Sequence, residues 1–154
     1  MLEKKRLEQL VLEKLKTYPE NRTGVSFQHQ QHWWVGYENL QKGKIMVFVG
    51  PSPLPRWERE GQWRKRRTMF VSVRIVASCD SNDADRVEML VDFSELLFNL
   101  VACMEITDGD SAAYNESAEF DVTSGPFDLD RMANNVFFTS FTLEFKDQQL
   151  FDRA

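Results

Sequence analysis

Cysteine and histidine are scarce in this chain, with two of each among 154 residues. A zinc site needs several such ligands at short spacing, yet Cys79 and Cys103 lack a C-x-x-C arrangement and are separated by a predicted helix. A helix of this length spans about 30 Å, far beyond the reach of a disulfide, so both cysteines are expected to be free thiols. The sequence therefore predicts neither a zinc site nor a disulfide.

Long apolar runs are also missing. No stretch approaches the ~20 apolar residues of a membrane-spanning helix, and residues 1–6 lack the apolar centre of a signal peptide. We therefore expect no contact with a membrane, and a protein that is made and used inside a cell.

Glycine is sparse and scattered, so the sequence has no glycine-rich phosphate loop and no nucleophile elbow. Residues 108–119 begin like a calcium loop, but alanines stand where that loop needs a ligand and a glycine. A pair of catalytic carboxylates among Glu105, Asp108 and Asp110 would make the chain a small hydrolase, although no spacing favours it. We expect no enzymatic activity, no metal and no cofactor.

The most informative stretch runs from Met69 to Met104. Its first part, Met69–Ser78, alternates with a period of two and predicts a strand with one well-buried face. Residues 80–83 then supply a turn and a helix N-cap, and from Ala84 onward apolar residues follow the spacing of one helical face. A strand, a short acidic turn and a helix are therefore predicted here.

This predicted helix has a second apolar stripe, displaced around the helix from the first. The stripe consists of Met89, Phe93, Leu96, Leu100 and Cys103. A helix that rests on one sheet needs a single stripe, so a second stripe requires another covering surface. Either another segment of the same chain or a neighbouring subunit provides it, and the sequence leaves both alternatives open.

The remaining segments complete an α+β pattern. Periodicity predicts one more helix at residues 7–18, strands at 25–29, 44–50, 118–123 and 136–146, and loops at 105–115 and 127–135. This order predicts a mainly antiparallel sheet of four to five strands, with two main helices packed on one side and a long hairpin arm. By size the chain is a single domain, residues 1–154, with the arm at 51–67 and a C-terminal tail at 147–154.

Charge is distributed asymmetrically along the chain. Between Val87 and Asp130 there are eleven acidic residues and no lysine or arginine. The arm, in contrast, is basic and carries two tryptophans. Its residues of interest are Arg56, Trp57, Arg59, Trp63, Arg64, Lys65, Arg66 and Arg67. This asymmetry suits contact with nucleic acid, head-to-tail contact between identical subunits, or merely solvated surface charge.

The order of elements resembles that of the tail terminator proteins of long-tailed bacteriophages and the related tail-completion and neck proteins. An amphipathic helix, residues 7–18, precedes a buried strand that ends in Val47-Phe48-Val49-Gly50-Pro51. A long arm, the Met69–Ser78 strand, a helix and a final aromatic strand, Phe137–Lys146, follow. The resemblance is one of layout and size, and it covers residues 7–146.

The resemblance implies a structural virion protein without catalytic residues. Such proteins form a ring, usually a hexamer, that caps the tail tube and joins it to the head–tail connector, with DNA passing through the lumen without sequence readout. The expected location is the tail–neck junction of the virion, after synthesis in the host cytoplasm. The alternatives are another head–tail joining protein and, from a different class, a small nucleic-acid-binding regulator.

Three features of the sequence suit a ring. The second stripe of the helix offers a subunit face, and Leu150 and Phe151 of the tail can dock on a neighbour or on the tube. The basic arm can pair with the acidic region Glu105–Asp121 of the next subunit, in a contact that closes into a ring. The expected interface or lumen residues are therefore those of the arm and the stripe, with Glu105, Asp108, Asp110, Leu150 and Phe151.

Overall fold

The computed structural model describes residues 4–17, 24–30, 43–52, 57–60, 64–102, 104–108, 111–122 and 125–148. The elements of these ranges are, in order, α1 (Lys4–Lys16), β1 (Val25–His29), β2 (Ile45–Pro51), β3 (Trp57–Glu60), β4 (Arg64–Ser78), α2 (Ala84–Val101), β5 (Glu105–Asp108), β6 (Ser111–Phe120), α3 (Leu129–Ala133) and β7 (Val136–Gln148). The predicted α+β class is confirmed.

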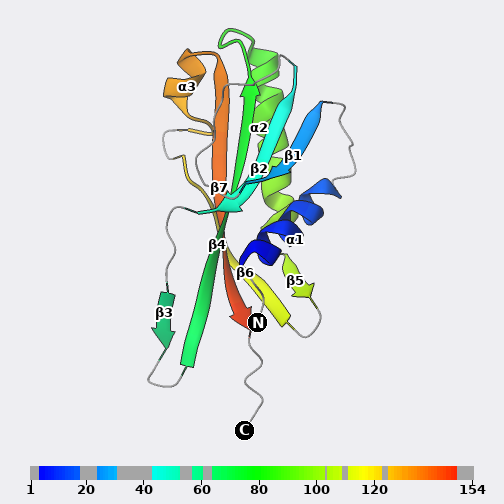
Figure 1. Cartoon of the computed structure of the whole chain (residues 1–154). Helices are drawn as coiled ribbons and strands as arrows, with labels where there is room; N and C mark the ends of the chain where they lie inside the picture. Colours follow the sequence, from blue (N-terminus) through cyan, green and yellow to red (C-terminus); the bar gives the residue numbers. More distant parts are fainter. Residues whose placement is uncertain are drawn as a thin grey trace.

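Six strands of the sheet lie in the order β1-β2-β4-β7-β6-β5. The seventh strand, β3, pairs with β4 and stands outside this linear order. β1 runs parallel to β2, whereas the other pairs are antiparallel. The sheet is therefore mixed, with mainly antiparallel pairing as expected and more strands than predicted. Figure 1 shows β4 and β7 as the long central strands, with the short β3 set apart near one end of β4.

One face of the central strands is apolar and forms the core. On β4, Val71, Val73 and Ile75 are fully buried. The antiparallel register places Leu143 of β7 opposite Val71, and Phe141 opposite Val73, so the two strands present one continuous apolar surface. This alternation is the period of two that predicts the strand from the sequence.

Both main helices cover this apolar face, as predicted. α2 begins where Asp83 caps it, because Oδ1 of Asp83 accepts a hydrogen bond from the backbone N of Arg86 at 3.1 Å. The buried residues of α2 are Leu90, Phe93, Ser94, Leu97 and Val101. α1 contacts α2 and adds the fully buried Leu7, Val11 and Leu15 to the same core.

Two segments predicted to be loops contain regular structure. β5 and the first half of β6 fall within the segment 105–115, and their antiparallel register pairs Glu105 with Tyr114 and Asp108 with Ser111. The acidic and small residues of this segment have weak strand propensity, but pairing of β6 with β7 satisfies their backbone. The short α3 lies within residues 127–135, and its single turn is too brief to show a helical period in the sequence.

Candidate self-association surfaces

β3 and the first residues of β4 form the hairpin arm that the sequence predicts. Its antiparallel register pairs Trp57 with Arg67 and Glu60 with Arg64. β4 joins β7 only from Thr68 onward, so the preceding four residues have β3 as their strand partner. Figure 1 shows this hairpin projecting beyond the body of the sheet, away from α2 and α3. We refer to β3 together with residues 64–67 as the basic hairpin.

The sequence of the basic hairpin is strongly basic. Its eight residues comprise five basic residues, two glutamates and one tryptophan. The backbone register pairs Glu58 with Arg66 and Arg59 with Lys65. The hairpin therefore combines positive net charge with an aromatic residue.

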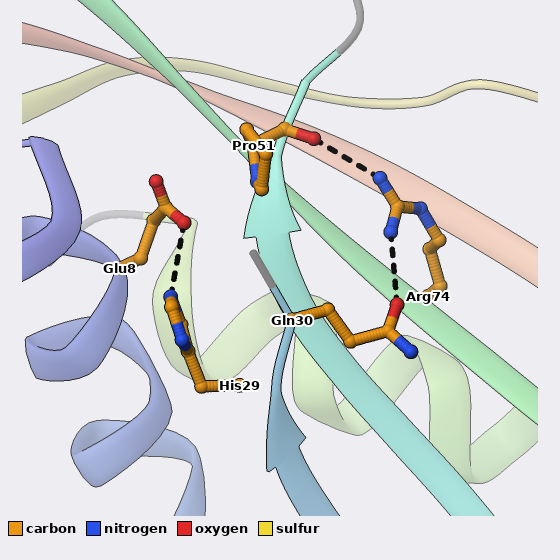
Figure 2. A network of polar contacts seen from close by, with 5 residues as sticks. All are labelled: Glu8, His29, Gln30, Pro51 and Arg74. Carbon is orange, nitrogen blue, oxygen red and sulfur yellow. Dashed lines mark hydrogen bonds and ion pairs between the residues drawn. The ribbon is translucent and has the colours of Figure 1, made fainter. Parts of the chain in front are cut away.

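Arg74 fixes the chain where the arm leaves the sheet. It lies on β4, on the face opposite the core, and is only 4% exposed. Its Nη2 donates a hydrogen bond to the backbone O of Pro51 at 3.0 Å, and its Nη1 donates to Oε1 of Gln30 at 3.4 Å (Figure 2). Pro51 is the last residue of β2, so a buried guanidinium holds the strand end from which the arm departs.

A second buried contact joins α1 to the edge of the sheet. Glu8 of α1 is 4% exposed, and its Oε1 lies 3.0 Å from Nε2 of His29 on β1 (Figure 2). His29 thus has a carboxylate partner that links a helix to a strand. Within the described ranges, no group of three or more histidine, cysteine or acidic side chains is placed to hold a metal ion.

Most described residues of the second apolar stripe of α2 pack against the core of the same chain. Phe93 is 1% exposed, and Met89 and Leu100 are partly buried against the core. The prediction that Phe93 contributes to a subunit face is wrong, because core residues lie three positions before it and four after it on the same helical face. Among the described members of the stripe, Leu96 is the one classed as exposed, at 42%.

The exposed side of α2 is acidic. Asp85, Glu88, Asp92 and Glu95 are exposed and recur at spacings of three and four, which places them along one side of the helix next to Leu96. Among the residues that the structure describes, these four carboxylates have no ion pair. We refer to these five residues as the acidic face of α2. Their spacing is visible in the sequence, but only the burial pattern shows that this side of the helix faces solvent.

The acidic segment predicted to receive the arm is divided among secondary-structure elements. Glu105 is exposed on β5, and Asp108 ends that strand. Asp121 follows β6, and its carboxylate accepts hydrogen bonds from Oγ of Ser140 at 2.7 Å and Oγ1 of Thr142 at 2.8 Å. Part of this segment is therefore engaged within the chain.

Several predicted interface residues lie outside the described ranges, and their roles remain predictions. They are Arg56, Trp63, Asp110, Leu150 and Phe151.

The thiol of Cys79 is free and buried at the end of β4, as the sequence predicts. Burial raises the pKa of this thiol, Asp83 and Asp80 raise it further, and Arg86 opposes them. Cys79 is therefore a neutral core residue rather than a reactive thiolate. Cys103 lies outside the described ranges.

Comparisons with known proteins identify a similar fold but no family for this chain. No family model matches this sequence, and no curated protein matches it. Seven solved chains match the structure. One of them, which carries no functional name, aligns with a TM-score of 0.52 at 12% identity and covers 96% of this chain and 97% of its own length. At that identity the likeness shows the fold alone. In the described ranges no helix is long and apolar enough to cross a membrane.

Proposed function

We propose that this chain is a structural virion protein, a tail terminator that forms a ring on the tail tube of a long-tailed bacteriophage. The observation that carries this proposal is the basic hairpin, which projects from the sheet and whose eight residues include five basic and two acidic ones. Carboxylates are exposed elsewhere on the same chain, along α2. Opposite charges at different places on one chain favour head-to-tail contacts between copies, and such contacts produce a ring when the rotation closes.

The order of elements supports the same proposal. The helix, buried strand, arm, long strand, second helix and final strand on which the resemblance rests are α1, β2, the basic hairpin, β4, α2 and β7. The proposed ring caps the tail tube, binds the head–tail connector and lets genomic DNA pass through its lumen. The proposal places the protein at the tail–neck junction, and a different neck protein is its nearest variant.

Electron microscopy of the purified protein tests this proposal directly. Negatively stained samples at low salt are expected to contain rings with a central hole wide enough for duplex DNA. In phage particles, a specific antibody is expected to label the junction between tail and neck. Labelling on the head side of the connector would identify another neck protein, and absence of the chain from the particles would refute a structural role.

A nucleic-acid-binding regulator is the second candidate, and the composition of the basic hairpin favours it. Its five basic residues and Trp57 are of the types that bind single-stranded nucleic acid through charge and stacking. Fluorescence anisotropy with short DNA tests it. Monomers that bind DNA with an affinity falling steeply as salt rises would support the regulator, and weak or salt-independent binding would reject it.

A further inference from the structure

We propose that the hydroxyl of Thr139 is a built-in weak point in the contact between α2 and β7, which lets α2 separate from the sheet as a unit. The separation is a conformational change of the single chain, and it is independent of the proposed ring.

Thr139 places a polar atom in the apolar core without a partner. It lies on β7 between Phe137 and Phe141, on the core face, and all three side chains are fully buried. Among the residues that the structure describes, none forms a hydrogen bond with Oγ1 of Thr139. A buried hydroxyl that has lost its contact with water and gained no other partner raises the free energy of the packed state.

The position of Phe98 on α2 shows that this helix covers Thr139. The ring of Phe98 makes an edge contact with the ring of Phe141, with 5.3 Å between centroids. α2 follows β4 after a short turn and therefore runs in the same direction as β7, which is antiparallel to β4. Ser94 precedes Phe98 by one helical turn, about 6 Å, and Thr139 precedes Phe141 by about 6.7 Å along the strand. Ser94 and Thr139 thus lie near the same level of the contact.

Ser94 does not satisfy the hydroxyl of Thr139. It is buried on α2, but its Oγ donates a hydrogen bond to the backbone O of Leu90 in the same helix, at 2.8 Å. Its proton is therefore used within α2. The helix brings a second hydroxyl to this level of the core without joining it to the first.

The first turn of α2 contains another buried polar atom of this kind. In the described part of the chain, Nη2 of Arg86 is buried and has no hydrogen-bond partner. Arg86 interacts electrostatically with the thiol of Cys79, which follows β4, so its side chain lies near the end of the sheet. Movement of α2 away from the sheet returns both this N–H group and the hydroxyl of Thr139 to water. Two positions along one contact therefore favour separation.

The sheet keeps its own support when α2 moves. The inner half of β4 pairs with β2 on one side and β7 on the other, and α1 packs on β1 and β2. The turn before α2 is held by Asn135, whose backbone O accepts a hydrogen bond from N of Cys79 at 3.0 Å and whose Oδ1 accepts one from N of Ser81 at 3.1 Å. This turn stays with the start of β7 and serves as the pivot.

Hydrogen exchange of individual amides under native conditions tests the inference. In the wild type, central amides of α2 are expected to exchange about tenfold faster than those of β4, because α2 opens while the sheet stays folded. Thr139→Val replaces the hydroxyl by a methyl group of similar size. It is expected to slow exchange about tenfold in α2, equivalent to about 1.4 kcal/mol, and by the same factor in β4. Both openings return the hydroxyl to water, so both lose the same advantage.

Thr142→Val is the matched control, because it makes the same chemical change on the same strand. Thr142 lies on the opposite face of β7, and its Oγ1 donates a hydrogen bond to Oδ1 of Asp121 at 2.8 Å. Loss of this bond is expected to speed exchange in β4, which needs global unfolding. Exchange in α2 is expected to stay unchanged, because separation of α2 does not uncover Thr142.

Three results would overturn the inference. Wild-type amides of α2 that are as well protected as those of β4 would show that α2 does not open by itself. Slower exchange in β4 but not in α2 of Thr139→Val would show that the hydroxyl does not lie under the helix. Faster exchange in both elements of that variant would show that the hydroxyl has a favourable partner. None of these measurements depends on a ring, so the proposed function is tested separately.

Discussion

The two halves of β4 differ in their strand partners and in their composition. From Met69 to Ser78 the strand lies between β2 and β7, and its side chains are buried on both faces or nearly so. From Arg64 to Arg67 it has β3 as its partner and carries four consecutive basic residues. One continuous strand thus serves as the centre of the core and as one side of a projecting hairpin.

The stability of the fold and the recognition of a partner are therefore expected to depend on different parts of β4. Free energy of folding comes from apolar area removed from water, which is concentrated around the inner half of β4. The outer half has four consecutive basic residues, a composition that favours contact with a charged partner over burial in an apolar core. Substitutions in the two halves should therefore change different measured quantities.

The largest loss of stability is expected from Phe141→Ala, opposite the inner half of β4. Phe141 is fully buried, and its ring makes edge contacts with the rings of Phe98 and Phe120. The substitution leaves a cavity and should lower the free energy of unfolding by about 3–5 kcal/mol. Urea denaturation followed by circular dichroism measures it, and a loss below about 1 kcal/mol would show that the inner half is not the main source of stability.

A smaller loss is expected from Arg74→Met, which removes the charged group that holds the end of β2. The backbone O of Pro51 and the side chain of Gln30 lose their donor, and the expected destabilisation is about 1.5–3 kcal/mol. The conservative Arg74→Lys supplies a single ammonium in place of two separated donors and should recover only part of the loss. Full recovery by lysine would show that charge alone, and not the forked geometry, matters here.

The difference in stability between the wild type and Cys79→Ala is expected to depend on pH. Cys79 follows the last residue of β4. Because burial raises the pKa of this thiol above its ordinary value of 9.0, the folded state disfavours the thiolate. The stability that the neutral thiol contributes is complete below pH 9.0 and is lost as the pH rises through the folded pKa. The wild type should therefore lose stability relative to Cys79→Ala above that pH, and a constant difference across the alkaline range would contradict the burial.

The smallest change in stability is expected in the outer half. Lys65→Gln with Arg67→Gln should shift the free energy of unfolding by less than about 0.5 kcal/mol, because the change replaces polar side chains by polar side chains and removes no large apolar group. Urea denaturation at high salt, where copies are separated by screening, isolates the stability of the single chain. A large loss there would show that the hairpin is part of the folding unit.

Much of the fold could be predicted because the spacing of apolar residues along the chain reflects which side chains are buried. The alternation of Met69–Ser78 predicts the C-terminal part of β4, which begins earlier, at Arg64, and the helical spacing after Ala84 predicts α2 from its first residue. β5, the first part of β6 and α3 could not be predicted, since their residues have weak local preferences and adopt regular structure only beside a neighbouring strand, whereas the predicted strand at 118–123 overlaps the end of β6. Local propensity does not predict a strand whose conformation depends on pairing with a neighbouring strand.

By itself the sequence determined the α+β class, the basic arm, the buried strands and the helix that follows Asp83. Each of these features follows from the periodicity, the charge or the capping residues of a single segment. Only the tertiary structure decided that Phe93 belongs to the core, that Arg74 holds Pro51, and that β3 pairs with the first residues of β4. These facts depend on strand register and on the rotation of a helix against its sheet, and both are set by contacts between residues far apart in the chain.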